Sequence, residues 1–423
     1  MLDLANKKWP SSPLKQKNLD TEQLKQLLRI RADYEKSAFV SEGHLEVRAL
    51  GAKEFTKPIP PDESGITALI HHANGHIYGA TSGRNAHLFF YNPAPDADAV
   101  ADIGIVASEA AIPALALLPD GCLLGAVNRT NGGAALFIYR SCDVLLQEKD
   151  FAGLGVREIF DLPAEDQLFF STIDPCHSAG QIEVLTEPRL PEPMADVIAA
   201  DGRIYLLGAN SGTLYRYQEN ERQLKEIGRL DVNGNFSPRL IADADGNIYG
   251  AGLYGQLFRC PPDANRLEKL NARAPSLKGR ELYNQVTAWS YDWNSDIIYG
   301  GTVDGIIFQF IPGAGRIVCL GKPTDLTRVN GIAAAGGKIY ALVGERGDCA
   351  HLTCYCDATR ELRDLGCLLA RSERPWNGYE FSCMTTGNNG TVFMGENDRI
   401  SHLFLYFPPA GTNESIIKET KEM

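Results

Sequence analysis

An internal repeat is the feature that most limits the folds open to this chain. A similar unit recurs eight times along the 423 residues. Each copy has an apolar strand, a short turn, a second strand centred on an aromatic residue or leucine, and a third strand of Leu-Phe-x-Tyr character. The turn is Asn74-Gly75 in the first copy and Asp245-Gly246 in the fifth. Such pairs are favoured in two-residue hairpins because both central residues need positive φ.

The spacing of the repeat predicts the architecture. The aromatic residue or leucine of the second strand serves as a marker, and successive markers lie 36 to 53 residues apart, 45 on average. This is the period of a propeller blade made of four short antiparallel strands. We therefore predict an all-β chain forming a single β-propeller of about eight four-stranded blades. Seven is the alternative, because the third copy is irregular after Leu185. The markers are Tyr78, Leu124, Phe169, Tyr205, Tyr249, Tyr299, Tyr340 and Phe393.

A fourth strand closes most copies and often carries an aliphatic residue followed by glycine. The last copy ends at Tyr406-Phe407-Pro408-Pro409 with no such strand after it. An unassigned strand, Val47 to Gly51, precedes the first copy. We expect this N-terminal strand to complete the last blade, which would close the ring and remove its open sheet edges. The aliphatic-glycine pairs are Ile103-Gly104, Ile227-Gly228, Leu320-Gly321 and Leu365-Gly366.

The segments outside the repeat divide the chain into three parts. Residues 1–40 form an N-terminal extension, 41–409 the propeller, and 410–423 a polar tail that we expect to be flexible. Within the extension, residues 20–36 are predicted to be helical, with Asp20 as the cap and an apolar stripe of leucines. We expect this helix to pack on the rim or to contact a protein partner.

Composition and charge exclude several functions. The net charge of −12 argues against binding nucleic acid or an anionic membrane, since both require a cationic face. No stretch approaches 18 consecutive apolar residues, and Met1 to Asn18 is too polar for a signal peptide. Ten cysteines without regular spacing indicate free thiols in a reducing compartment, with disulfides as the alternative. These features predict a cytoplasmic protein.

No cofactor or metal is expected. His71, His72, His76 and His87 fit ordinary strand and turn positions better than a metal site. The cluster of Cys349, His351, Cys354 and Cys356 lacks a second pair with zinc spacing and is interpreted as small core residues. Asp243-x-Asp245-Gly246 lacks the later ligands of a calcium loop. A phosphate-binding loop of Walker type and a Gly-x-Ser-x-Gly elbow are both absent from the sequence.

The copy Ile298-Tyr299-Gly300-Gly301-Thr302-Val303-Asp304-Gly305-Ile306-Ile307-Phe308, followed by Leu320-Gly321, resembles bacterial β-propellers with blades of this style. Propeller lyases acting on acidic polysaccharides, and the streptogramin lyase, are similar in style. The resemblance covers residues 40–408 and implies a propeller fold with lyase-type chemistry as the enzymatic hypothesis. No catalytic motif matches residue by residue, so it transfers no site, and fold by itself does not imply function.

Arginines gather on one predicted face. The loops from strand 2 to strand 3, and from strand 4 to the next strand 1, emerge on the same side of a propeller, where ligand sites usually lie. Arginine suits bidentate capture of carboxylate or phosphate, and a neighbouring aromatic ring suits stacking on a sugar. The loop arginines are Arg84, Arg129, Arg157, Arg239, Arg280, Arg328, Arg346 and Arg399.

Two interpretations of this face remain open. In the first it binds an anionic ligand, such as a uronic-acid sugar, at the channel mouth. In the second the arginines form ion pairs between blades, with Glu158, Glu281, Glu345 and Glu380. The ligand-binding residues of the first interpretation are Arg239, Arg280, Arg328, Asn330, Trp376 and Tyr379.

A lyase needs a base, an acid and positive charge to hold the enolate. His177, Tyr254 and Tyr283 are the candidate catalytic residues. The main hypothesis is therefore binding or lyase-like processing of an anionic carbohydrate. The alternative is a non-catalytic scaffold that holds another protein through the same face or the N-terminal helix. The arginines and aromatic residues favour the first, and the missing signal peptide and acid/base motif favour the second.

Overall fold

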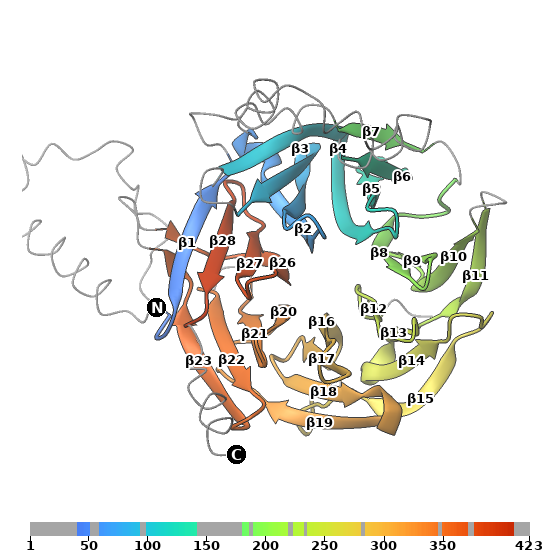
Figure 1. Cartoon of the computed structure of the whole chain (residues 1–423). Helices are drawn as coiled ribbons and strands as arrows, with labels where there is room; N and C mark the ends of the chain where they lie inside the picture. The colour runs from blue at the N-terminus through green and yellow to red at the C-terminus, as the bar shows by residue number, and fades with distance from the viewer. Residues whose placement is uncertain are drawn as a thin grey trace, which may run out of the picture.

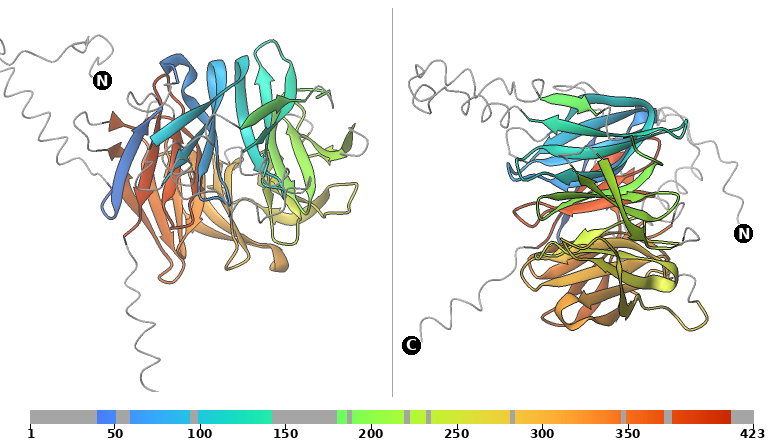
Figure 2. Two further views of the ribbon diagram at one scale, coloured as in Figure 1. Left: turned by 45° about the horizontal axis from the view of Figure 1, so that its top comes forward. Right: turned by 90° about the vertical axis from the view of Figure 1, so that its right-hand side faces the viewer.

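The computed structural model is a ring of antiparallel β-sheets (Figure 1). It describes residues 40–50, 59–93, 99–141, 180–185, 189–218, 223–231, 235–280, 284–345, 349–370 and 376–409. Seen from the side, the sheets form a disc whose two faces carry the loops (Figure 2). Within the described ranges there are three short 3-10 turns, η2 (Pro61–Glu63), η4 (Leu253–Gly255) and η6 (Pro312–Ala314), and no α-helix. The helix predicted over 20–36 lies outside these ranges.

Six sheets form the ring; five of them have four strands and one has six. A separate two-stranded ribbon accounts for the remaining described strands. The six-stranded sheet comprises β2 (Gly65–His71), β3 (Ile77–Asn92), β4 (Ala99–Leu117), β5 (Leu123–Arg129), β6 (Ala134–Arg140) and β7 (Gln181–Val184). The ribbon comprises β24 (Leu369–Ala370) and β25 (Trp376–Asn377).

The four-stranded sheets follow the chain order. The first two contain β8 (Met194–Ala200), β9 (Arg203–Gly208), β10 (Thr213–Gln218) and β11 (Gln223–Arg229), then β12 (Ile241–Ala242), β13 (Ile248–Ala251), β14 (Gln256–Cys260) and β15 (Glu268–Arg273). The next two contain β16 (Val286–Asp292), β17 (Ile297–Thr302), β18 (Ile307–Ile311) and β19 (Arg316–Gly321), then β20 (Val329–Ala335), β21 (Lys338–Val343), β22 (His351–Cys356) and β23 (Glu361–Cys367). The last contains β26 (Phe381–Thr386), β27 (Val392–Glu396), β28 (His402–Phe407) and β1 (His44–Ala49).

The prediction of about eight four-stranded blades is wrong. The first two repeats share the six-stranded sheet, because β4 is 19 residues long and pairs first with β3 and then with β5. The third repeat, with marker Phe169, lies outside the described ranges. The described strands on either side of it, β6 and β7, pair directly with each other. β6 and β7 belong to the six-stranded sheet. Because that sheet holds the markers of the first two repeats, the six described sheets hold seven of the eight predicted markers.

The markers themselves lie where the repeat predicts. The seven described markers are buried on the second strand of their repeats, on β3, β5, β9, β13, β17, β21 and β27. The glycine after the marker has a steric role in several repeats. A Cβ on Gly79 would lie 2.2 Å from the Phe89 ring, and one on Gly300 would lie 2.3 Å from Phe308. Glycine is therefore needed there because an aromatic ring, from β3 itself in the first repeat and from β18 at Gly300, covers the backbone.

The aliphatic-glycine pairs mark β-bulges in the fourth strands. The register shifts opposite Gly228, Gly321 and Gly366 in their respective sheets. Gly321 and Gly366 have φ of 124° and 114°, a region that favours glycine. A bulge of this kind bends and twists the outer strand.

The N-terminal strand closes the ring, as predicted. β1 pairs antiparallel with β28 from His44 opposite Phe407 to Ala49 opposite His402. Leu45 of β1 is 7% exposed and packs in a core cluster with Tyr340 and Tyr406. The last sheet thus contains strands from both ends of the described chain (Figure 1).

A buried ionic network anchors η2 to the first sheet. The ring nitrogens of His87 lie 2.9 Å from Glu63 Oε2 and 3.0 Å from Asp102 Oδ1. Arg84 and Asn85 also donate to Glu63. Burial disfavours the imidazolium, but the hydrogen bonds to Asp102 and Glu63 outweigh it and raise the pKa of His87. Burial likewise opposes the Glu63 carboxylate, but hydrogen bonds from His87, Arg84 and Asn85 lower the pKa of Glu63.

This network predicts a specific pH dependence of stability. The contribution of charged His87 is complete below its ordinary pKa of 6.5 and is lost as the pH rises through its higher folded pKa. The contribution of Glu63 is present above 4.5 and is lost as the pH falls through its lower folded pKa. The difference in unfolding free energy between the native protein and His87→Gln should therefore shrink as the pH rises above 6.5. Urea denaturation at a series of pH values measures it, and a constant difference would contradict the assignment.

Leu45→Ala should destabilise the ring by about 2 to 5 kcal/mol, because it removes a buried side chain from the closing strand. Leu277→Ala is the matched control, since Leu277 is 44% exposed and should change stability by less than about 0.5 kcal/mol. Chemical denaturation followed by tyrosine and tryptophan fluorescence compares the two. Equal midpoints for both variants would show that β1 contributes little to ring closure.

Candidate functional site

The channel through the ring is lined by the inner strands of all six sheets. Its middle is a cavity of about 270 Å3, lined by residues of β2, β4, β8, β12, β16, β20 and β26 together with Arg239 and Leu240. The six-stranded sheet contributes two of these strands, β2 and β4. The cavity continues into a wider mouth on each face of the disc.

Arg239 crosses the middle of the channel and ties three sheets together. Its guanidinium donates to the carbonyl oxygens of Pro113 at 2.6 Å and Thr67 at 3.4 Å, and it lies 3.6 Å from Asp196 Oδ1. Burial raises the pKa of Asp196, although the Arg239 charge and the backbone N–H groups of Leu240 and Val197 oppose this. Arg239 therefore acts as a structural cation of the channel.

One mouth contains two of the eight predicted loop arginines, Arg239 and Arg328. This arginine mouth is a cavity of about 600 Å3. Arg328 has a left-handed φ of 62°, and its Nε donates to Asn330 Oδ1 at 3.1 Å. Two arginines and two glutamates line the cavity, so its formal charge is balanced. The lining residues are Pro113, Ala195, Pro238, Arg239, Thr287, Arg328, Asn330, Glu345, Glu380, Phe381, Ser382 and Asn397.

The structure brings together part of the predicted ligand set. Arg239, Arg328 and Asn330 line the arginine mouth. Arg280 is not among its lining residues and instead lies 2.9 Å from the buried Asp304. Tyr379 is 41% exposed and precedes the lining residue Glu380. Trp376 lies on β25, and its side chain is outside the described part of the structure.

The predicted catalytic residues do not form a described constellation. Tyr254 is 44% exposed, has a left-handed φ of 54° in η4, and is not among the residues lining the arginine mouth. His177 and Tyr283 lie outside the described ranges. Their catalytic assignment stays a prediction.

Several loop arginines form ion pairs, as the second interpretation proposed, but with partners other than those expected. Arg84 pairs with Glu63 at 3.0 Å, and Arg399 pairs with Asp62 at 2.7 Å. Arg239 and Arg280 pair with aspartates. Of the proposed glutamates, Glu158 and Glu281 lie outside the described ranges. The carboxylates that hold these arginines are spread over loops and strands, and sequence spacing could not identify them.

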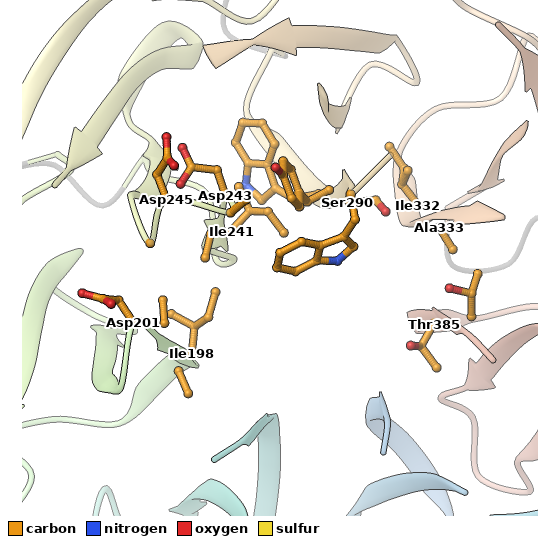
Figure 3. A pocket seen from close by; sticks show the side chains of 18 of the residues that line it. Ile198, Asp201, Ile241, Asp243, Asp245, Ser290, Ile332, Ala333 and Thr385 are labelled. Carbon is orange, nitrogen blue, oxygen red and sulfur yellow. The ribbon is translucent and has the colours of Figure 1, made fainter. Parts of the chain in front are cut away.

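The opposite mouth was not identified from the sequence. This aspartate mouth is a cavity of about 530 Å3 lined by Asp201, Asp243 and Asp245, aromatic residues and aliphatic residues, with no lysine or arginine among its described lining. Figure 3 shows the three aspartates on one side and Ile332, Ala333 and Thr385 on another. Asp201 and Asp245 belong to the strand 1–2 turns; from the sequence, Asp245 was interpreted as a turn residue in an incomplete calcium loop, and Asp201 was not singled out.

The aromatic wall of the aspartate mouth is partly open to solvent. Trp293 is 73% exposed, and its ring lies 4.8 Å from that of Tyr291 in an edge-to-face arrangement. The Tyr291 hydroxyl donates to Asp296 at 2.8 Å. Burial and this hydrogen bond raise the pKa of Tyr291 to about 12. The hydrogen bond to Asp296 orients the phenol beside Trp293.

The aspartates of this mouth differ in their partners. Asp243 accepts the Tyr249 hydroxyl at 2.8 Å and the backbone N–H of Asn247 at 2.9 Å, which assigns it to the turn. Asp201 shares Arg203 with Asp263, so two carboxylates face one guanidinium. The formal charge of the aspartates at this mouth together with Arg203 is therefore negative.

Comparison with known proteins identifies the fold. Neither the family models nor the curated proteins contain a match to this chain. Among solved structures, the crystal structure of RRP9 WD40 repeats is similar, with a TM-score of 0.54 and 10% sequence identity over 88% of this chain and 100% of that one. At this identity the likeness shows a β-propeller fold and nothing finer.

Two searches of the described residues add constraints. None of the helices found there has the length and apolar character needed to cross a membrane. Groups of three or more His, Cys, Asp or Glu side chains arranged for a metal ion do not occur in the same part of the chain.

Arg239→Met should destabilise the protein by about 3 kcal/mol, because Asp196 would remain buried without its cation. Adding Asp196→Asn should recover part of that loss by removing the uncompensated charge. Urea denaturation of the single and double variants measures both effects. If Arg239→Met were as stable as the native protein, the structural role assigned to Arg239 would be wrong, and Arg239 would again be a candidate ligand-binding residue.

Proposed function

We propose that this protein is a non-catalytic interaction propeller that binds a cationic segment of a partner protein at the aspartate mouth. The observation that carries the proposal is Trp293, an indole 73% exposed at a concave site whose described lining has three aspartates and no lysine or arginine. A largely exposed tryptophan beside a concave site offers an anchor that a partner can bury.

The chemistry of this mouth suits an arginine- or lysine-bearing segment with apolar neighbours. Tryptophan is among the commonest anchors of protein interfaces. Its ring face also attracts a guanidinium or ammonium group. Trp293 contacts Tyr291 edge to face, so the two rings form one aromatic surface at the mouth. Ile332, Ala333 and Met384 supply an apolar floor for the partner's aliphatic groups.

Electrostatics supports a cationic partner. Asp201, Asp243 and Asp245 line the mouth, Arg203 pairs with Asp201, and the whole chain has a net charge of −12. Such a field accelerates encounter with a cationic segment and disfavours an anionic one. The WD40 likeness supports the proposal at the level of fold, by analogy.

The anionic-carbohydrate hypothesis receives less support. The arginine mouth has two glutamates for its two arginines, and Arg239 is occupied by two carbonyl oxygens and Asp196. A lyase clamp requires positive charge left over for the substrate. The scaffold hypothesis therefore accounts better for both mouths. The partner contact once expected of residues 20–36 remains a prediction outside the described ranges.

A synthetic peptide of alternating arginine and leucine should bind the full-length protein, and its glutamate–leucine counterpart should not. Trp293→Ala should weaken binding by about 30-fold or more, the effect of losing a central anchor. Asp245→Asn should weaken it less and reduce its salt dependence. Fluorescence anisotropy at low and high salt measures each affinity.

Tyr379→Ala is the matched control, because Tyr379 is another exposed aromatic residue, 41% accessible, beside the arginine mouth. It should leave peptide binding unchanged. Binding of oligogalacturonate that Arg328→Ala abolishes, together with no binding of the cationic peptide, would overturn the proposal in favour of the carbohydrate hypothesis.

A further inference from the structure

A cysteine, a histidine and an aspartate lie in line at the end of the β22–β23 hairpin. His351 Nε2 is 3.2 Å from Cys367 Sγ. His351 Nδ1 is 2.8 Å from Asp364 Oδ2 and 3.1 Å from Oδ1. Sequence analysis grouped His351 with Cys349, Cys354 and Cys356 and interpreted the cluster as core. The structure instead selects Cys367 as the thiol that His351 contacts.

A β-bulge creates this alignment. His351 lies opposite Cys367 in the register, and the register shifts by one residue so that Thr353 lies opposite Asp364. Residues three apart on a regular strand point to opposite faces. The bulge, with Gly366 at a φ of 114°, allows Asp364 and Cys367 both to reach the same histidine. The Gly366 N–H also donates to Asp364 Oδ1 at 2.9 Å, which fixes the carboxylate.

The arrangement sets the tautomer of His351. The Asp364 carboxylate can only accept, so Nδ1 carries the proton and donates it. Nε2 is then an acceptor and faces the Cys367 thiol, ready to take its proton. The Leu368 N–H donates to the Ala350 carbonyl oxygen at 2.8 Å, so the strand pairing that sets His351 opposite Cys367 continues towards Cys349 and brings Cys349 next to Cys367. Cys349 is exposed and Cys367 is partly exposed, so a small reagent can reach the pair.

We propose that Cys367 and Cys349 form a peroxide-sensitive dithiol, with His351 as the base and Asp364 as its positioning residue. The pair is independent of the aspartate mouth and of the function proposed for it. The reagent is a hydroperoxide, and the product is a Cys349–Cys367 disulfide.

The reaction balances in two steps. Cys367 gives its proton to His351 Nε2 as its sulfur attacks one peroxide oxygen; the O–O bond breaks, and the leaving oxygen takes the proton and departs as an alcohol or water. Cys367 is then a sulfenic acid. Cys349 sulfur attacks Cys367 sulfur, the S–O bond breaks, and hydroxide leaves as water with the Cys349 proton. The two thiols are oxidised by two electrons and the peroxide is reduced.

Proton transfer to His351 controls the reactivity of Cys367. Burial, with the neighbouring Cys349 and Asp364, raises the pKa of the Cys367 thiol. A protonated thiol is a poor nucleophile, so reaction depends on proton transfer to His351. This predicts that loss of the base slows Cys367 more than it slows an ordinary exposed thiol.

The test treats the full-length protein with stoichiometric hydrogen peroxide and maps the thiols by mass spectrometry without reduction. We expect a peptide pair linked through Cys349 and Cys367. In Cys349→Ser, oxidation should stop at the sulfenic acid of Cys367, which dimedone traps. His351→Gln should slow oxidation of Cys367 by about tenfold or more. Cys319, an exposed thiol of β19, is the internal control and should be unaffected by His351→Gln.

Asp364→Asn tests positioning separately. This variant should oxidise Cys367 more slowly and with a shifted pH profile, because the amide can reverse the His351 tautomer. Circular dichroism and the melting temperature show whether the variant keeps its fold. Asp364→Glu should restore part of the rate. Oxidation of Cys367 no faster than Cys319, or a disulfide mapped to another pair, would overturn the proposal.

Discussion

The pairing of β1 with β28 is the interaction on which the rest of the structure depends. β1, from the start of the described chain, forms the outermost strand of the last sheet, and its six residues pair with six residues of β28 near the other end. Unpaired backbone N–H and C=O groups at open sheet edges are costly and promote association. Once the ring is closed, every inner strand faces a common axis, and residues far apart in sequence meet there.

That geometry explains why Arg239 contacts the carbonyl oxygens of Pro113 and Thr67, both from the six-stranded sheet, and also lies near Asp196 of the next sheet. It also separates two mouths of different chemistry. The arginine mouth combines cations with carboxylates, whereas the aspartate mouth combines carboxylates with Trp293 and Tyr291. A closed ring presents these mouths on opposite faces, so a partner at one does not exclude a ligand at the other.

Sequence periodicity predicted much of the fold. Seven markers, the closing strand and the bulge glycines lie where the repeat indicated, because burial of one aromatic residue and the turn chemistry of Asp-Gly are local properties. The blade number was wrong, because β4 continues from one repeat into the next, and spacing alone does not show where one sheet ends. The candidate site was predicted in part. Loop arginines were identified, but their carboxylate partners and the aspartate mouth were not.

The sequence by itself therefore determined the all-β repeat, the hairpin turns and the joining of the two ends, since each depends on residues within one repeat or at its edge. Tertiary structure decided which side chains converge. The contact between His351 and Asp364 depends on a one-residue bulge, and the exposure of Trp293 depends on how neighbouring sheets pack. Distances across the ring and along a bulged strand arise from packing, which no local pattern of residue types encodes.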